Sequence, residues 1–345
     1  MALDLVAYLL IIFVIILHVI VLGFVLKKRP KSIAGKHVVV TGGSSGIGLW
    51  TAIHCVKRGA NVTILARNVQ VLNKAKEEIE KHRINEEQKI LTKSLDVAKS
   101  FAVVEQGLKE VEDAMDLPIY MLVNCAGLAI CGLVEEVSVD DAKMMMDVNY
   151  YGTYFATRYI LPKMKASGEG IIVITSSQAA LLGIYGYGPY AATKFALRGL
   201  AETIHMEASH AGVNVTLALP CDTDTPGFER EEKTKPQETK LISSSGGLVQ
   251  PSDVAERLVN DALTGSFFSV YGFESWILSI LCVGMAPWSG YYLNMLQLVL
   301  MAPLRLVSFF IRRNFNSIIK DCSKDKPKKR LKHTFKTQSY YYFVI

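Results

Sequence analysis

Short apolar runs rich in β-branched residues recur along the middle of the chain, separated by longer amphipathic or charged stretches. Such runs predict buried strands, and the stretches between them predict helices. Strands are expected at 37–40, 61–67, 89–97, 118–124, 171–175, 213–220 and 266–272. Helices are expected after the turn at 41–48, between 97 and 118, and at 69–82, 138–165, 190–210 and 251–263. This alternation predicts a Rossmann-type, doubly wound α/β fold with a parallel sheet over residues 36–272.

The N-terminal end of the chain is far more apolar than this middle part. Residues 5–26 form an apolar run of 22 residues, and a basic cluster from Lys27 to Arg29 follows it directly. About 20 apolar residues span a bilayer as a helix. We therefore interpret residues 1–29 as a transmembrane signal-anchor, and the positive-inside rule places the following domain in the cytosol. A cleaved signal peptide is the alternative, but the run is long and lacks a basic region before it.

The C-terminal part is apolar again from Trp276 onward. The segment 276–311 contains two apolar stretches, 276–288 and 291–311, which are interrupted by Pro287 and Pro303, and we expect it to form membrane-associated helices. A hairpin within the membrane, a pair of interfacial helices and two true spans all fit this pattern, and an apolar cap packed on the enzyme is the alternative. The tail 320–345 is strongly basic, which suits an anionic, cytosolic membrane surface.

Composition narrows the function classes. Half of the 345 residues are apolar and the mean hydropathy is +0.25, but the excess lies at the two ends. The net charge of +6 comes mostly from the tail and the anchor flank, so it requires no nucleic acid partner. The six cysteines form no CxxC pair and the seven histidines form no HExxH motif. We therefore predict no metal site and no disulfide framework.

Residues 226–247 are polar and show no clear apolar period. The stretch follows the CDTDTP turn at 221–226, beyond the carboxyl end of a predicted strand. A loop of this length inside a compact domain is usually a functional lid or disordered. We therefore expect an irregular loop here that contacts the substrate.

A glycine-rich turn, TGGSSGIG at 41–48, connects the first predicted strand to a helix. Glycines let a backbone approach a diphosphate closely, and a helix N-terminus offers N–H donors and a positive dipole end. The turn therefore predicts a dinucleotide site, although a plain tight turn has the same composition. The residues expected to contact the cofactor are Gly42, Ser44, Ser45, Gly46, Ile47 and Gly48.

Three residues at the ends of later strands extend this site. Arg67 ends the second strand where NAD-specific proteins carry an acidic residue, and an arginine can instead pair with a 2′-phosphate. The sequence therefore favours NADPH, with Ser44 assisting, unless Arg67 is merely a solvated charge. Asp96 can accept a hydrogen bond from an adenine amino group, and the turn from Asn124 to Gly127 can line the cofactor.

The candidate chemistry lies between Ser177 and Lys194. Tyr190 and Lys194 are four residues apart on a predicted helix, so they share one face. A nearby ammonium is expected to lower the pKa of a tyrosine toward working pH. Ser177 follows a predicted strand, where its hydroxyl can hold a carbonyl oxygen for the tyrosine to protonate. Such a pair also arises by chance, and the cofactor site upstream is what gives it weight.

Together these pieces resemble the short-chain dehydrogenase/reductase family. The matching elements are TGGSSGIG (41–48), Asp96, NCAG (124–127), Asn149, Ser177 and YAATK (190–194), in the order of the family. The resemblance implies that Tyr190 is the acid/base, that Lys194 adjusts its pKa and holds the ribose, and that Asn149 holds a relay water. Ser177 is preferred to Ser176 because thirteen residues to the tyrosine is the usual spacing in the family. We also expect Thr223 to contact the cofactor.

Within that family, the chain resembles membrane-bound reductases of the 3-keto group of a sphingoid base. The similarity is carried by the N-terminal anchor, PCDTDTPGF (220–228), KTKPQETKLIS (233–243) and GMAP (284–287). It implies a long-chain lipid ketone as substrate, NADPH as cofactor and the cytosolic face of the endoplasmic reticulum membrane, and it allows a homo-oligomer. Val71 departs from the lysine expected four positions after Arg67, so the NADPH preference depends more on Arg67. A reductase of another lipid ketone (3-ketoacyl, steroid or retinoid) and a non-catalytic membrane scaffold are the rival hypotheses.

Overall fold

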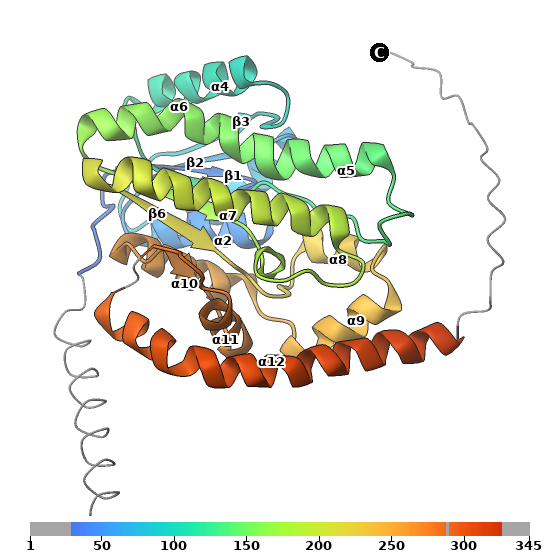
Figure 1. The fold of residues 1–345 in the computed structure, drawn as a ribbon. Coiled ribbons are helices and arrows are strands. Elements are labelled where there is room, and N and C mark those ends of the chain that lie inside the picture. The colour runs from blue at the N-terminus through green and yellow to red at the C-terminus, as the bar shows by residue number, and fades with distance from the viewer. Residues whose placement is uncertain (1–28, 288–289, 326–345) are drawn as a thin grey trace, which may run out of the picture.

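A computed structural model describes residues 29–287 and 290–325 (Figure 1). The predicted signal-anchor, apart from Arg29, and the basic tail from residue 326 onward lie outside the described residues. Between these limits the chain folds as a layered α/β domain, with two further helices at its C-terminal side.

The prediction of a parallel, doubly wound sheet is confirmed. Seven parallel strands lie in the order β3-β2-β1-β4-β5-β6-β7. Their bounds are β1 (His37–Thr41), β2 (Asn61–Ala66), β3 (Ile90–Ser94), β4 (Ile119–Asn124), β5 (Gly170–Thr175), β6 (Val213–Ala218) and β7 (Phe268–Ser269). The last strand is shorter than predicted, because Gly272, with a φ of +86°, turns the chain into the next helix.

The helices cover both faces of the sheet. They are α2 (Gly46–Val56), α3 (Val69–Glu80), α4 (Phe101–Met115), α5 (Val139–Met146), α6 (Gly152–Ser167), α7 (Gly188–Ala208) and α10 (Pro251–Thr264). Successive strand residues point to opposite faces. Val39 therefore packs in a core with α4, α6 and α7, whereas Val38 and Val40 pack in a second core with α2, α3 and α10. Because both faces are covered, the central strands β1, β4 and β5 contain continuous apolar runs, as the sequence indicated.

The segment 226–247 is helical, and the prediction of an irregular loop is wrong. It forms α8 (Pro226–Glu232), α9 (Gln237–Ser243) and a 3₁₀ turn at Ser244–Gly246. The side chain of Thr225 caps α8 by accepting a hydrogen bond from the Phe228 N–H at 3.0 Å. No apolar period marks this segment because the side chains that it buries include the polar ones of Lys235, between the two helices, and of Glu238 and Thr239 on α9.

The C-terminal segment contains α11 (Phe273–Leu281) and one continuous helix, α12 (Tyr291–Asp325). Pro303 lies inside α12, because a proline removes one helical hydrogen bond and can be carried inside a long helix. Helix α12 lies along one side of the domain, beneath α11 and α9 (Figure 1). The guanidinium of Arg198 donates to the carbonyls of Cys282 and Val283, both at 2.9 Å, and so ties the connection after α11 to α7.

Among the described residues, one helical stretch, Leu293–Lys324, is long and apolar enough to cross a membrane by length and composition. Only 11% of its most apolar window is buried in the protein. The outward side chains of this helix therefore define a large apolar surface.

Candidate active site

The glycine-rich turn between β1 and α2 has a backbone that only glycine can adopt at its key positions. Gly42 and Gly46 have φ angles of +65° and +54°. A Cβ atom on Gly42 would lie 2.8 Å from the backbone of Ala126, and one on Gly48 would overlap the carbonyl oxygen of Gly42. These glycines let the turn fold tightly against the next loop and against its own helix. The turn thus forms a smooth backbone cradle at the N-terminus of α2.

The first turn of α2 suits a diphosphate. Ser45 is the N-cap residue, but its side chain makes no capping hydrogen bond, so it does not occupy the N–H groups there. Ser44 and Ile47 lie half-exposed beside it in the same turn. A helix N-terminus of this kind stabilises anionic groups through its N–H donors and its dipole. The residues present therefore fit the phosphates of a nicotinamide dinucleotide.

The strand order reverses between β1 and β4, and the turn lies at this point. In doubly wound sheets, dinucleotides bind at such a switch point. The Thr41 hydroxyl accepts hydrogen bonds from the N–H groups of Cys125 and Ala126, at 3.1 and 3.2 Å, and so joins the two loops. The carbonyl of Leu65, near the end of β2, accepts from the Gly43 N–H at 3.3 Å. The cradle is thereby fixed to the ends of three neighbouring strands.

Arg67 and Asp96 lie at the same edge of the sheet, just after β2 and β3. The Arg67 side chain is exposed and forms no ion pair among the described residues. Its neighbour Asn68 caps α3, so no carboxylate occupies the position that would bind a ribose hydroxyl. Asp96 is half-buried, and one of its oxygens accepts from the Ala98 N–H at 3.0 Å. Both side chains remain available to a cofactor.

Asn124 points into the protein. Its amide nitrogen donates to the Thr157 hydroxyl and to the Val173 carbonyl, both at 3.3 Å, and its side-chain oxygen is buried without a hydrogen-bond partner in the structure. The side chain therefore links β4 to α6 and β5. From this position it supports the turn at 124–127 rather than presenting its amide to a ligand.

Thr225, which was not predicted from the sequence, packs against the cradle, whereas the predicted Thr223 is turned toward its own loop. The Thr223 hydroxyl donates to the nearby Cys221 carbonyl at 2.8 Å, and its side chain is buried. By contrast, a Cβ on Gly46 would lie 3.0 Å from the side-chain methyl of Thr225. The available signal was the TP pair that begins α8, since a threonine before proline is a common helix cap.

The structure distinguishes the two serines after β5. Ser176 is buried, and its hydroxyl donates to the Lys194 carbonyl at 3.0 Å, so it holds α7 against the sheet. The Ser177 hydroxyl accepts from the Ala179 N–H at 3.2 Å, and its hydrogen bond with the Tyr190 phenol lowers the pKa of that phenol. Ser177 is therefore the serine that lies at the tyrosine.

Tyr190 and Lys194 lie one turn apart on α7, as predicted. The Lys194 ammonium donates to the Thr175 carbonyl at 3.1 Å and lies 5.6 Å from the centre of the Tyr190 ring. Burial lowers the pKa of Lys194 to about 8. Burial also raises the pKa of Tyr190, and the Glu231 carboxylate adds to this rise. Desolvation of the phenolate is thus the largest effect on the pKa of Tyr190, and the lowering of that pKa by Lys194 stays a prediction.

Asn149 lies in a π-helical turn, Asp147–Tyr151, between α5 and α6. Single π-turns inside helices are frequent at functional sites. The Asn149 amide is fully buried and binds both the N–H and the carbonyl of Leu128, at 2.8 and 2.9 Å, as well as the Thr193 hydroxyl at 2.9 Å. Its side chain thus fixes the 127–128 backbone against α7. The relay water of Asn149 stays a prediction.

A second group of polar side chains lies beside Tyr190. The ring of Tyr187 is 5.4 Å from the ring of Tyr190, and its hydroxyl donates to the Glu231 carboxylate on α8. The ammonium of Lys235 is fully buried and pairs with Glu231 at 3.1 Å, Glu232 at 2.7 Å and Asp222 at 3.4 Å. The ion pairs around Lys235 were not predicted from the sequence, because buried charged residues give no periodic pattern of apolar positions.

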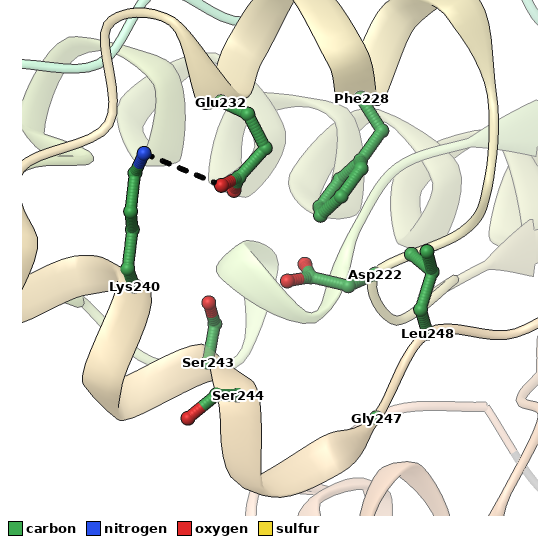
Figure 2. A pocket seen from close by; sticks show the side chains of 8 residues that line it. All are labelled: Asp222, Phe228, Glu232, Lys240, Ser243, Ser244, Gly247 and Leu248. Atoms are coloured by element: carbon green, nitrogen blue, oxygen red, sulfur yellow. Dashed lines mark ion pairs between the residues drawn. The ribbon is translucent and has the colours of Figure 1, made fainter.

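A pocket of about 350 Å³ opens between α8, α9 and the turn after β6 (Figure 2). The side chains of Asp222 and Phe228 point into it, and Leu248 lies at one side. Glu232 and Lys240 face each other across it as an ion pair at 3.5 Å. The pocket therefore combines apolar walls with carboxylates and lies beside the polar group around Lys235.

Comparison with known proteins identifies the chain. The family model described as short chain dehydrogenase matches residues 36–236. The chain belongs to this short-chain dehydrogenase family. It is therefore an oxidoreductase that uses a nicotinamide cofactor. The family assignment agrees with the cradle at the end of β1. It also agrees with the arrangement of Ser177, after β5, next to Tyr190 and Lys194 on α7.

Relatives of known function are similar to this short-chain dehydrogenase over nearly its whole length. A 3-dehydrosphinganine reductase of Danio rerio is 45% identical over 310 residues, which cover 90% of this chain and 92% of the relative. A 3-ketodihydrosphingosine reductase of Bos taurus is 42% identical over 316 residues, 92% of this chain and 94% of the relative.

Solved structures are similar in fold. A levodione reductase has a TM-score of 0.62 at 21% identity and covers 70% of this chain. An alcohol dehydrogenase from the archaeon Thermococcus sibiricus, in complex with 5-hydroxy-NADP, has a TM-score of 0.57 at 26% identity. The match covers 68% of this chain and 94% of that dehydrogenase. Both comparisons leave roughly a third of this chain unmatched.

Proposed function

We propose that this protein is an NADPH-dependent reductase that converts 3-ketodihydrosphingosine to dihydrosphingosine, a step of sphingolipid biosynthesis. The observation that supports the substrate best is the extent of the similarity to the Danio rerio enzyme. The family model ends at residue 236, whereas that similarity covers 310 residues and so includes α11 and the first half of α12. A reductase of an unrelated ketone would share the dinucleotide domain but not these C-terminal helices.

The residues on α7 and after β5 account for the chemistry. When bound, the nicotinamide supplies a hydride to the ketone carbon. The Ser177 hydroxyl orients the ketone oxygen, and Tyr190 donates a proton to it. The raised pKa of Tyr190 keeps the phenol protonated and ready to donate. As the phenol gives up its proton, the Lys194 ammonium nearby stabilises the negative charge that develops.

The direct test is NADPH oxidation by membranes that carry this protein, with a panel of long-chain ketones. We expect 3-ketodihydrosphingosine to give the highest kcat/KM in the panel. The panel includes 3-ketoacyl, steroid and retinoid ketones, since each would fit the same catalytic residues. A higher kcat/KM for one of these would replace the proposed substrate, and no turnover of any ketone would favour a non-catalytic scaffold.

The cofactor preference can be tested at Arg67. We expect Arg67→Ala to raise the KM for NADPH about ten- to a hundredfold, the worth of one charge-assisted hydrogen bond, and to change the KM for NADH little. The reason is that the exposed guanidinium would meet only the 2′-phosphate, which NADH lacks. Steady-state kinetics with both cofactors measure this. Equal changes for the two cofactors would contradict a contact with the 2′-phosphate, and Arg83→Ala, also on the surface, is the control.

We propose that α12 lies against the membrane. Its burial pattern is the reverse of that of a helix in water: it buries Gln297 and Ser308, at 7% and 8% exposure, and exposes Leu298, Val299 and Phe310, at 70–72%. An apolar face of this size marks a contact with another apolar phase. Basic residues follow toward its C-terminal end, which suits anionic headgroups.

This surface would bring the active site to a substrate that resides in the bilayer. The long alkyl chain of a sphingoid base favours the membrane, at about 0.8 kcal/mol for each buried CH₂. Helix α12 packs against α9, and α9 belongs to the pocket beside the catalytic residues. We therefore propose that α9 and α12 form the opening through which the lipid reaches the site.

Acidic substitutions on α12 test this opening. We expect the double variant Leu298→Glu, Val299→Glu to lower kcat/KM for the long-chain ketone in vesicles about tenfold or more, since charges weaken insertion of the apolar face. A soluble short-chain ketone should be reduced at the wild-type rate. The matched control is Val139→Glu, because Val139 is 69% exposed and its helix, α5, lies away from α12 in Figure 1. An equal loss with both ketones would show that α12 supports the fold only.

We propose the cytosolic face of the endoplasmic reticulum as the location, on the basis of the basic residues after the apolar N-terminal run and the sphingolipid substrate. Protease protection on sealed microsomes tests the orientation. We expect added protease to digest the catalytic domain without detergent. Protection until detergent is added would place the domain in the lumen.

A further inference from the structure

Glu231 occupies a position that the reduction of a simple ketone does not require. It lies on α8, and its carboxylate accepts a hydrogen bond from Tyr187, whose ring packs on that of the catalytic Tyr190 at 5.4 Å. Its charge reaches both catalytic residues: after burial, it is the main cause of the raised pKa of Tyr190, and it partly opposes the lowering of the Lys194 pKa by burial. A negative charge beside a tyrosine opposes the charge that develops as the tyrosine gives up its proton. A carboxylate here is therefore a disadvantage unless the substrate makes use of it.

The proposed substrate carries the matching charge. A 3-keto sphingoid base has an ammonium group on the carbon atom next to its ketone. When Tyr190 and Ser177 hold the ketone oxygen, this ammonium must lie in the immediate neighbourhood of the tyrosine. An unpaired ammonium in a site closed from water carries a large desolvation cost, so the site needs an acceptor there. Lys194, the charged group nearest to Tyr190 on α7, has the wrong sign for this task.

We propose that Glu231 binds the ammonium group of the substrate and so selects amino ketones over neutral ketones. This proposal rests on the proposed function. One oxygen of Glu231 is held by Tyr187 and by the buried Lys235, whereas the other oxygen accepts no hydrogen bond among the described residues. The first oxygen fixes the orientation of the carboxylate, and the second remains for the ligand.

The neighbouring charges favour Glu231 over Glu232 and Asp222 as the carboxylate that binds the ammonium group. Glu232 is 34% exposed and pairs with both Lys235 and Lys240, at 2.7 and 3.5 Å, so lysines already neutralise it. Asp222 also pairs with Lys235, at 3.4 Å, and its side chain points into the pocket of Figure 2. Three carboxylates and two lysines leave one negative charge in this group. A single ammonium balances that charge.

The test compares Glu231→Gln with the wild type on two ketones of equal chain length. One is 3-ketodihydrosphingosine, and the other has hydrogen in place of its amino group. We expect kcat/KM for the amino ketone to fall about ten- to a hundredfold, as for loss of a charge-assisted hydrogen bond. The value for the deamino ketone should stay the same or rise. The ratio of kcat/KM for the amino ketone to kcat/KM for the deamino ketone would therefore be much smaller in the variant than in the wild type.

Glu232→Gln is the matched control, because it also removes one carboxylate from Lys235 but leaves the group beside Tyr190 in place. We expect this control to keep the wild-type ratio. If both ketones lose activity equally in Glu231→Gln, the carboxylate only holds Lys235 and the inference is overturned. If Glu231→Gln does not fold, Tyr187→Phe, which frees the carboxylate from its phenol, should lower the same ratio, and an unchanged ratio overturns the inference.

The proposed function and the inference about Glu231 fail on different results. The first case concerns the proposed function. It fails if the wild-type protein reduces neither ketone, or if another lipid ketone is reduced with a higher kcat/KM than the amino ketone. The inference alone fails if the wild-type protein prefers the amino ketone and the Glu231→Gln variant keeps that preference.

Discussion

We expect Tyr190→Phe to abolish nearly all turnover and to leave the fold and the affinity for NADPH unchanged. The substitution removes one hydroxyl, which is the proton donor to the ketone oxygen. General acid catalysis of this kind contributes about 10²–10⁴-fold in rate. The ring would remain packed against Tyr187, so α7 keeps its place. The measurements are kcat for 3-ketodihydrosphingosine and NADPH binding by fluorescence.

The matched control is Tyr154→Phe on α6, which also loses a single hydroxyl. That hydroxyl accepts from Arg158 at 3.1 Å on the surface, away from the catalytic residues. We expect wild-type turnover for the control. If Tyr190→Phe kept most of its rate with NADPH binding intact, another group would have to protonate the ketone, and the assignment of Tyr190 would be wrong.

The sheet could be predicted from the sequence because its strands are buried on both faces. All five residues of β1 and all six of β4 are buried, and each strand contains a continuous apolar run, 38–40 in β1 and 119–123 in β4. Their order along the chain, with helices between, then leaves few topologies. The glycine-rich turn could be predicted for a similar reason, since its residue type follows directly from the backbone that it must adopt.

The helices α8 and α9 could not be predicted, because polar side chains fill much of their contact with the domain. Lys235, in the connection between the two helices, is buried because three carboxylates surround it: Glu231 and Glu232 at the end of α8, and Asp222 from the turn after β6. Thr239 is buried because its hydroxyl donates to the Tyr185 carbonyl at 2.6 Å. Neither the ion pairs of Lys235 nor the hydrogen bond of Thr239 produces a periodic pattern of apolar residues in the sequence. The same contacts place Glu231 beside Tyr190, so this part of the site was not visible in the sequence.

For Tyr190 and Lys194, the sequence predicted the positions of the side chains but not their pKa values. Spacing alone placed Tyr190 and Lys194 on one face of a helix, and the structure has them there. Their pKa values depend on burial, which the spacing does not contain. The spacing of the two residues indicates the attraction between an ammonium and a phenolate but not the loss of water around both groups. In the folded protein the loss of water is the larger effect, and it moves the two pKa values toward the neutral forms.

The second large effect is expected at Gly48, in the first turn of α2. A methyl group added there would overlap the carbonyl oxygen of Gly42, and both groups belong to the backbone of the cradle. The turn must therefore shift, with a cost of about 1–3 kcal/mol for overpacking. We expect Gly48→Ala to weaken NADPH binding about ten- to a hundredfold. Thermal unfolding with and without NADPH measures this, because a bound ligand raises the Tm according to its affinity.

The matched control for this substitution is Gly199→Ala. Gly199 lies on the exposed side of α7, and a Cβ there would have no atom within 4 Å. Alanine is favoured over glycine inside a helix by about 0.5–1 kcal/mol. We therefore expect the control to raise the Tm of the free protein and to keep the full increase on adding NADPH. The Gly48→Ala variant should lose most of that increase. If it kept the wild-type increase, the turn would not be where the cofactor phosphates bind.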